Sequence, residues 1–366
     1  MKKLLLAVLA VLALLAAYLA LWPVPVQPVA WQAPPAPGYQ GPHAANTRLA
    51  GLTLIRLPAG ESGPEHVVLA RDGMLYAAVA SGRILRMNPD GSAPEVYAET
   101  GGRVLGFDFD AAGRLIAADA EKGLLAVGTD RRVSVLADAV DGDPIRYADA
   151  VVVARDGRIY FSDASRRFGP GQWGGTFEAA VLDILEQRST GRILEHDPAS
   201  GRTRVVVRGL SFANGVALSE DERHLFVAET GKYRIWKVAV EAADLDVGAG
   251  SPQATVLFDN LPGYPDNLMR GAEGRIWVGF SGPRSPPVDD MAGRPFLRAM
   301  TLRLPRALWP VPKAYGHVFA FDESGRVVAN LQDPGGSYPE TTGVTETADR
   351  LYIQNLHLPV LGWKAR

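Results

Sequence analysis

The chain of 366 residues has no cysteine, only six histidines and no excess of either charge, with 38 basic and 40 acidic side chains. The absence of cysteine excludes disulfides, thiolate metal ligands and a cysteine nucleophile. Because charges of both signs are interspersed, the overall composition indicates neither a nucleic-acid groove nor a polybasic membrane patch, and we expect no nucleic-acid partner. The chain also lacks a G-x-S-x-G motif, and its Gly-Gly pairs lack the context of phosphate-binding loops. Neither a serine-hydrolase elbow nor a nucleotide site is therefore indicated.

Charge is missing altogether from one long stretch at the N-terminus. Leu4 to Trp22 is a run of 19 uncharged residues, close to the length of a membrane-spanning helix, and Lys2 and Lys3 precede it. The best small-x-small cleavage site, at residues 18–20, is poor for a signal peptide. We therefore expect residues 1–22 to be an uncleaved, single-pass membrane signal anchor. The positive-inside rule then places the N-terminus in the cytoplasm and the remaining chain on the periplasmic or extracytoplasmic side.

Residues 23–45 differ in composition from the rest of the chain. Seven prolines lie between positions 23 and 42. A proline-rich segment of this kind is typically a semi-extended spacer, and we expect it to pack against nothing. The folded domain should then comprise residues 46–366.

A hairpin pattern recurs six times in this domain, most clearly at residues 211–238. One aromatic or aliphatic residue in the second half of each copy serves as a reference, and these residues are Tyr76, Ile116, Tyr160, Phe226, Trp277 and Tyr352. Their spacings are 40, 44, 66, 51 and 75 residues, and the two longest contain insertions. A basic period of about 40 to 50 residues fits a four-stranded propeller blade. The sequence therefore predicts an all-β protein, a six-bladed β-propeller that leaves no open sheet edges.

Two inserted segments interrupt the repeats. Residues 168–192 have the apolar spacing of an amphipathic helix. Residues 284–316 are basic, proline-rich and apolar. We expect both segments to be partly helical. We expect the second segment to cap a face of the propeller. Alternatively, the second segment could shape substrate access or lie on the membrane surface.

The inner strand of each blade should bring equivalent residues to one depth on the central axis. Counting back eleven residues from the reference position, or twelve in the fourth copy, gives Glu65, Leu105, Asp149, Asn214 and Asp266, with Thr341 in the sixth copy. Crowded carboxylates repel one another unless a cation or a proton is bound. Oxygen ligands suit a hard divalent cation, so calcium is the first expectation and magnesium or manganese the next. The alternative is that these side chains only cap strand ends and turns.

The predicted cation ligands are therefore Glu65, Asp149, Asn214 and Asp266, together with Asn267, which follows Asp266 directly. His66 adjoins Glu65, and His357 lies near the end of the sixth copy. Both histidines could reach the axial cavity, and we predict that they contact a small-molecule substrate; a packed or hydrogen-bonded structural role is the alternative for each.

Several segments resemble the strictosidine synthase-like family, of the adipocyte plasma membrane-associated type: FANGVALSEDERHLFVAETGKYRIWKV, YPDNLMRGAEGRIWVGFSGPRSP, YADAVVVARDGRIYFSDAS and LYIQNLHLPVLGW. The resemblance covers about residues 46 to 364, and that family is similar to paraoxonases and to the gluconolactonase/regucalcin group. It implies a six-bladed propeller and, in membrane-associated members, a signal anchor.

The resemblance also bears on the site residues. In metal-dependent relatives the axial cation is held by residues that match Glu65, Asn214, Asp266 and Asn267, whereas Asp149 stands where those relatives usually have asparagine. Strictosidine synthases proper use a catalytic glutamate near the start of the last repeat. Thr342 occupies that place in this chain, which argues against condensation of an amine with an aldehyde.

These observations lead to a first hypothesis, a membrane-anchored, metal-dependent hydrolase of lactones or aryl esters. The cation would polarise the carbonyl, and Asp266 would be the catalytic carboxylate that activates or orients water. The alternative is a membrane-tethered binding or scaffold propeller with a structural cation. A carbon–nitrogen condensing enzyme of the strictosidine type is the third and weakest hypothesis.

Overall fold

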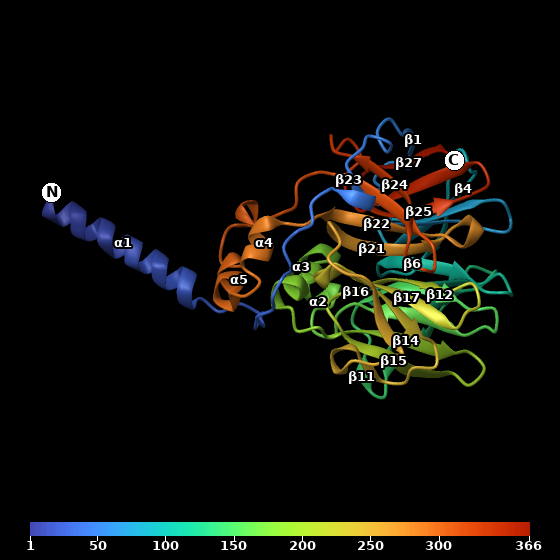
Figure 1. The fold of residues 1–366 in the computed structure, drawn as a ribbon, viewed down its shortest axis with the longest axis horizontal. Helices are drawn as coiled ribbons and strands as arrows, with labels where there is room; N and C mark the ends of the chain where they lie inside the picture. The colour runs from blue at the N-terminus through green and yellow to red at the C-terminus, as the bar shows by residue number, and fades with distance from the viewer.

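The six hairpin repeats form six antiparallel sheets in the computed structural model, which describes residues 1–366. The first strands of neighbouring sheets contact one another in a closed ring, in the order β2, β6, β12, β16, β21 and β25. Figure 1 shows the sheets gathered into one body, with a single helix projecting from one end. The prediction of a six-bladed β-propeller is confirmed.

Each blade has four main strands, which follow one another from the axis outward. The first blade comprises β2 (His66–Leu69), β3 (Leu75–Ala78), β4 (Arg83–Met87) and β5 (Glu95–Glu99). The second comprises β6 (Val104–Phe109), β7 (Leu115–Asp119), β8 (Gly123–Val127) and β9 (Val133–Ala137). The third comprises β12 (Ala148–Val153), β13 (Ile159–Asp163), β14 (Gly191–Asp197) and β15 (Arg202–Leu210). The fourth blade comprises β16 (Ala213–Leu218), β17 (His224–Glu229), β18 (Arg234–Ala239) and β20 (Ala254–Phe258). The fifth comprises β21 (Gly263–Arg270), β22 (Ile276–Pro283), β23 (Gly316–Phe321) and β24 (Val327–Asp333). The sixth comprises β25 (Thr341–Glu346), β26 (Arg350–Asn355), β27 (Val360–Ala365) and β1 (Thr53–Arg56).

Short elements complete the chain. A small hairpin joins the second blade to the third, and β19 extends the third blade in parallel; these strands are β10 (Ala139–Val140), β11 (Asp143–Pro144) and β19 (Leu245–Asp246). The 3₁₀ turns are η1 (Gly41–His43), η2 (Thr230–Lys232), η3 (Val247–Ala249), η4 (Ala272–Gly274) and η5 (Arg306–Leu308).

The two ends of the domain close the ring. Strand β1 pairs antiparallel with β27, from Thr53 opposite Trp363 to Arg56 opposite Val360. The sixth blade is thereby built from both termini of the domain, and no disulfide reinforces this closure in a chain without cysteine. Pairing the outer edge in this way leaves the blade with its full set of strands.

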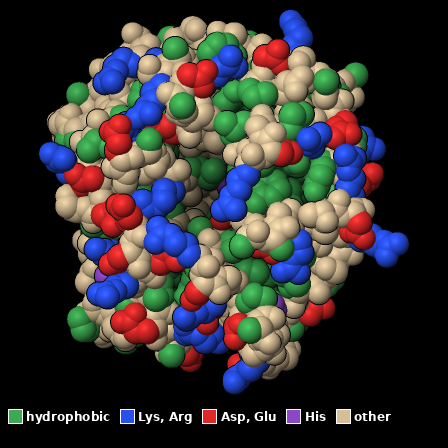
Figure 2. Space-filling model, turned by 90° about the vertical axis from the view of Figure 1, so that its right-hand side faces the viewer, with side chains coloured by type: hydrophobic (Ala, Val, Ile, Leu, Met, Phe, Trp, Pro, Cys, Tyr) green, Lys and Arg blue, Asp and Glu red, His purple; other side chains and the backbone are tan.

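All six reference residues lie on the second strand of a blade, as the repeat pattern predicts. The turns that precede them lie at the end of the propeller away from the projecting helix. Gly73 and Gly157 in these turns have φ of +75° and +91°, a conformation that favours glycine. Figure 2 shows this face, on which acidic and basic side chains are mixed around a central hollow.

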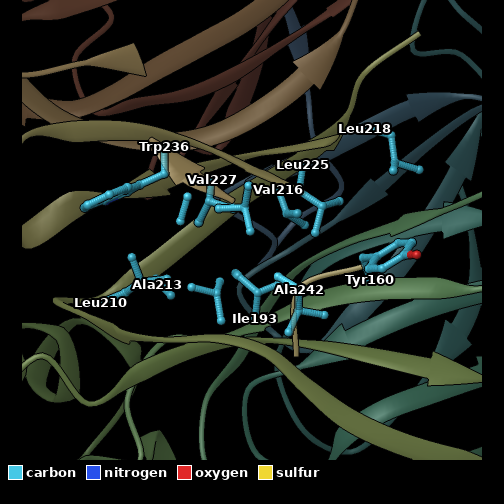
Figure 3. Packing of buried hydrophobic residues seen from close by; sticks show 14 of the residues in the cluster. Tyr160, Ile193, Leu210, Ala213, Val216, Leu218, Leu225, Val227, Trp236 and Ala242 are labelled. Atoms are coloured by element: carbon cyan, nitrogen blue, oxygen red, sulfur yellow. The ribbon is translucent and has the colours of Figure 1, made fainter. Parts of the chain in front are cut away.

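Neighbouring blades bury apolar side chains against one another. Between the third and fourth blades, Ile193 and Leu210 pack against Val216, Val227 and Trp236 in one cluster (Figure 3). These residues alternate along their strands, so that each sheet presents an apolar face to the next blade. Burying both faces of each sheet is what the radial arrangement achieves.

Helices cover the end of the propeller from which α1 (Lys2–Leu21) projects (Figure 1). The two inserted segments form this cover, and both are partly helical as predicted: α2 (Pro170–Trp173), α3 (Thr176–Glu186), α4 (Pro286–Asp290) and α5 (Pro295–Thr301). The α1 helix buries none of its side chains, and it is long and apolar enough to cross a membrane.

Residues 23–45 do pack against the domain, contrary to the expectation of a free spacer. Val26 is buried in a cluster with Phe168 and Phe212, and the Val29 N–H donates to the Glu186 carbonyl at 2.8 Å. Proline lacks an N–H, so this strap cannot join a sheet by regular pairing. Its carbonyls instead accept hydrogen bonds from side chains; for example, Arg284 Nη2 donates to the Pro34 carbonyl at 2.7 Å.

Candidate active site and cation site

A cavity of about 810 Å³ lies between the inner strands and the helical cover. Glu65, Asp149, Asn214 and Asp266 form part of its lining and come from four different blades. Asn267 lies beside them, buried, and its Nδ2 donates to the Glu65 carbonyl at 3.0 Å. The structure thus brings the five predicted cation ligands to one end of the axis.

Irregularities in the inner strands place these side chains there. The pairing of first and second strands shifts register between Ala148 and Val151, between Ala213 and Val216, and between Pro265 and Leu268. Each of these intervals contains a cavity-lining acid or amide, and a β-bulge re-aims the side chain of its extra residue. Regular alternation of side chains along an unbulged strand would not have directed these acids and amides into the cavity.

Close contact between inner strands also requires glycine beside Asn214. A Cβ atom on Gly215 would lie 2.4 Å from the Asp266 carbonyl oxygen and 2.3 Å from the Leu268 nitrogen. Both of those atoms belong to the backbone and cannot move aside easily. The Asn214–Gly215 pair therefore lets the fourth and fifth blades approach at the depth of the site.

An arginine that the repeat count does not single out enters the site. Arg103 Nη2 lies 2.5 Å from Glu65 Oε2, and both side chains are buried. Arg103 stands two residues before Leu105, the apolar member of the predicted ring. No local pattern in the sequence pairs this arginine with Glu65, so the repeat count could not find it.

The charges in this part of the cavity do not balance within the protein. Glu65, Asp149 and Asp266 supply three carboxylates, and Arg103 is paired with Glu65 alone. Burial raises the pKa of Asp149 and of Asp266 well above the ordinary range, and repulsion from Glu65 raises both further. Without another cation, the cavity thus favours proton uptake by these carboxyl groups.

The donor set is compatible with a hard cation. Three oxygens, Asn214 Oδ1, Asp266 Oδ1 and Asn267 Oδ1, are buried without a hydrogen-bond partner. Buried acceptors without a partner are costly, and a cation would satisfy them. No three carboxylate or imidazole groups of the chain are arranged as a metal site by themselves. A cation held here would therefore need the amide oxygens of Asn214 and Asn267 as well as carboxylates.

The two predicted substrate-binding histidines have different positions. His357 lines the cavity, and its Nδ1 lies 2.8 Å from Glu340 Oε2, a contact that raises the pKa of His357. His66 is buried edge-on against Phe107, with ring centroids 5.0 Å apart. Burial lowers the pKa of His66 to about 4, and the side chain lies behind the cavity lining. His66 therefore has the position of a packed, neutral histidine.

The helical cover is linked to the propeller by a buried carboxyl group. Asp183 on α3 accepts a hydrogen bond from Ser165 Oγ at 2.6 Å. Burial raises the pKa of Asp183 to about 7, against an ordinary value of 3.8. The folded protein therefore binds this proton more tightly than the unfolded chain does.

We expect this proton to make stability depend on pH. The unfolded chain loses it near pH 4, whereas the folded protein keeps it to about pH 7. The contribution of Asp183 is therefore fully present below pH 4 and is lost as pH rises to 7, by about 2 to 4 kcal/mol. Asp183→Asn should remove that part of the dependence in urea titrations between pH 4.5 and 8. An unchanged slope would contradict this assignment.

The fold and this site define a class: six-bladed β-propellers with a buried cluster of carboxylates and amides at the covered end of the axis. Two family models match, "Strictosidine synthase-like, N-terminal" at residues 41–87 and "Strictosidine synthase" at residues 149–243. Protein STRICTOSIDINE SYNTHASE-LIKE 7 of Arabidopsis thaliana is 31% identical over 76% of this chain and 72% of its own length. The chain belongs to the strictosidine synthase-like family.

Other relatives support this family assignment. STRICTOSIDINE SYNTHASE-LIKE 13 of Arabidopsis thaliana is 35% identical over 64% of this chain, and the match spans 57% of that protein. Adipocyte plasma membrane-associated protein of Rattus norvegicus is 29% identical over 82% of each chain.

Solved structures show the same fold at low sequence identity. A gluconolactonase from Xanthomonas campestris has a TM-score of 0.61 at 19% identity, covering 92% of this chain and 99% of its own. A calcium-binding regucalcin from Agrobacterium tumefaciens has a TM-score of 0.56 at 14% identity, covering 86% and 94%.

Proposed function

We propose that the protein is a membrane-anchored, cation-dependent hydrolase of lactones or aryl esters. One observation carries the proposal: three buried oxygens without partners lie among carboxylates whose charge exceeds that of Arg103, beside a large cavity. The names of two structural neighbours, a gluconolactonase and a calcium-binding protein, support it. Calcium is the first candidate, because the donors are all oxygen.

A divalent cation at this place would polarise the substrate carbonyl and stabilise the oxyanion that forms. Glu65, Asp149, Asn214, Asp266 and Asn267 would hold it. Asp266 takes a proton from water as the water oxygen bonds to the carbonyl carbon. The bond from that carbon to the leaving oxygen then breaks, and the leaving oxygen receives the proton.

The cavity walls suit the apolar part of an ester. Phe177, Val181 and Ile184 from α3 face the segment from Trp309 to Pro312 across the cavity. Apolar walls with few polar groups are typical of small-molecule sites, and they also keep bulk water from the carbonyl.

A binding or scaffold propeller with a structural cation is the second candidate. The observation that favours it is the buried Arg103–Glu65 pair, which already neutralises one carboxylate. This candidate predicts cation-dependent stability without ester turnover. A strictosidine-type condensation is disfavoured, because Thr342 supplies no carboxylate and its Oγ1 donates to the Glu65 carbonyl at 2.8 Å.

The membrane part of the proposal is carried by α1. Its composition suits a bilayer, and one relative is named a plasma membrane-associated protein. Lys2 and Lys3 at its start support an orientation with the N-terminus in the cytoplasm and the propeller on the periplasmic or extracytoplasmic side.

Thermal melting of the full chain in detergent tests the cation site. A ligand that binds only the folded state at a hundred times its Kd adds about 2.7 kcal/mol, which raises Tm by about 5 °C. We expect such a rise when calcium is added after chelation, and its loss in Glu65→Ala. Asp156→Asn, in an exposed turn, is the control that keeps the rise. If no divalent cation shifts the wild-type Tm, the cation-dependent mechanism is wrong.

A further inference from the structure

One part of the helical cover has an unusual surface. The segment from Arg294 to Lys313, which we call the arm, contains no acidic side chain and five basic ones, of which Arg298 is buried and the other four reach the surface. Three of its large apolar side chains are largely exposed, Phe296 at 55%, Leu308 at 64% and Val311 at 60%. Exposed apolar side chains beside basic ones are typical of segments that lie in the headgroup layer of a membrane.

The arm is fastened to the end of α1. Arg303 Nε donates to the Trp22 carbonyl at 2.7 Å, and its Nη1 donates to the Leu19 carbonyl at 3.0 Å. Figure 1 shows α5 beside the last turn of α1, at the end where the helix meets the domain. A helix of 20 residues is about 30 Å long, which is the thickness of the hydrocarbon core. If α1 spans the bilayer, its last turn lies at the interface, and so does the arm.

The cavity borders this same surface. Arg306, Trp309 and Val311 of the arm line it, opposite Phe177 and Glu178 on α3. Arg306 Nη2 lies 2.5 Å from Glu178 Oε1, and its guanidinium lies 5.3 Å from the centre of the Phe177 ring. The arm and α3 therefore meet beside the cavity at this ion pair, and a second contact joins them where Arg298 Nη1 donates to the Leu185 carbonyl at 3.0 Å.

The opposite face of the propeller has a different character. Acidic and basic side chains are mixed over it (Figure 2). A mixed surface of this kind has no net attraction to anionic lipid, whereas the basic side chains of the arm are attracted to it. With α1 in a bilayer, the basic charge and the exposed apolar side chains of the arm would hold this end of the domain against the membrane.

We propose that the arm lies in the headgroup layer of an anionic phospholipid bilayer and that the cavity opens toward the lipid. The substrates would then be amphiphilic esters or lactones with a hydrocarbon chain that enter from the membrane. The substrate class rests on the proposed hydrolase function, whereas the position of the arm does not.

The absence of cysteine makes the position of the arm directly measurable. Leu308→Cys and Phe296→Cys, each labelled with an environment-sensitive fluorophore, are compared with Ala112→Cys in a turn on the opposite face. The full chain is placed in vesicles of phosphatidylcholine with phosphatidylglycerol. We expect the two arm probes to be quenched by brominated lipid and protected from iodide, and the Ala112 probe to show the reverse. Arm probes as open to iodide as the Ala112 probe would overturn the proposal.

The substrate class has its own readout. Lactones with one head group and either a short or a long alkyl chain are assayed with the protein in the same vesicles. We expect a preference for the long chain that is lost in Phe296→Asp/Leu308→Asp, with turnover of the short lactone unchanged. Equal turnover of both lactones by the wild type would refute entry from lipid. No turnover of either lactone, or of an aryl ester assayed beside them, would refute the hydrolase function and leave the probe result standing.

Discussion

Asp266→Asn is expected to abolish ester and lactone turnover while making the cation-free protein more stable. The substitution keeps the shape of the side chain but removes a buried carboxylate that burial and Glu65 both disfavour in its charged form. We expect a loss of about 10² to 10⁴ in kcat, the usual contribution of a general base. Removing the repelled charge should raise Tm in chelator by about 2 °C, and the rise on adding calcium should disappear.

A half-buried carboxyl outside the cavity provides the control. Asp108 accepts a hydrogen bond from the Val153 N–H at 2.9 Å, and burial raises its pKa to about 6. Asp108→Asn should leave both turnover and the calcium response intact. The two variants are compared by steady-state kinetics and by melting with and without calcium. Full activity in Asp266→Asn would exclude this carboxylate as the base.

Arg103→Gln should have the largest effect on stability. The guanidinium is buried against Glu65, and removing one partner of a buried ion pair costs about 3 to 5 kcal/mol because the other charge stays unpaired. A bound divalent cation could replace the lost positive charge. We therefore expect calcium to bind Arg103→Gln about tenfold more tightly than it binds the wild type, measured by calorimetry, and to restore much of the lost stability.

Arg192→Gln controls for the general cost of breaking a buried ion pair. Arg192 Nε lies 2.9 Å from Asp163 Oδ2 in the third blade, and both side chains are buried outside the cavity lining. This variant should lose a similar amount of stability without any change in calcium affinity. If both variants respond to calcium alike, Arg103 does not compete with a cation for Glu65. Arg103→Lys, which keeps the positive charge, should show no such rise in calcium affinity.

The propeller itself could be predicted from the sequence because its information is local. Alternation along each strand, a turn glycine before most second strands and a repeated period are enough to define a blade, and six blades follow by counting. The reference residues from Tyr76 to Tyr352 accordingly lie on the second strands. The same counting named Glu65, Asp149, Asn214 and Asp266, because equivalent positions in a closed ring must meet at its axis.

The tertiary structure decided what depends on distant parts of the chain. Arg103 reaches Glu65 across 38 positions, and β1 pairs with β27 across the whole domain; no local pattern encodes either contact. The strap of residues 23–45 looked like a free spacer because proline disfavours regular pairing, yet arginines from the insertions meet its carbonyls. The bulges that aim Asp149, Asn214 and Asp266 at the axis are likewise visible only in the paired strands. The sequence alone thus determined the repeat and its axial residues, whereas packing between blades and insertions decided which charges are paired and what covers the cavity.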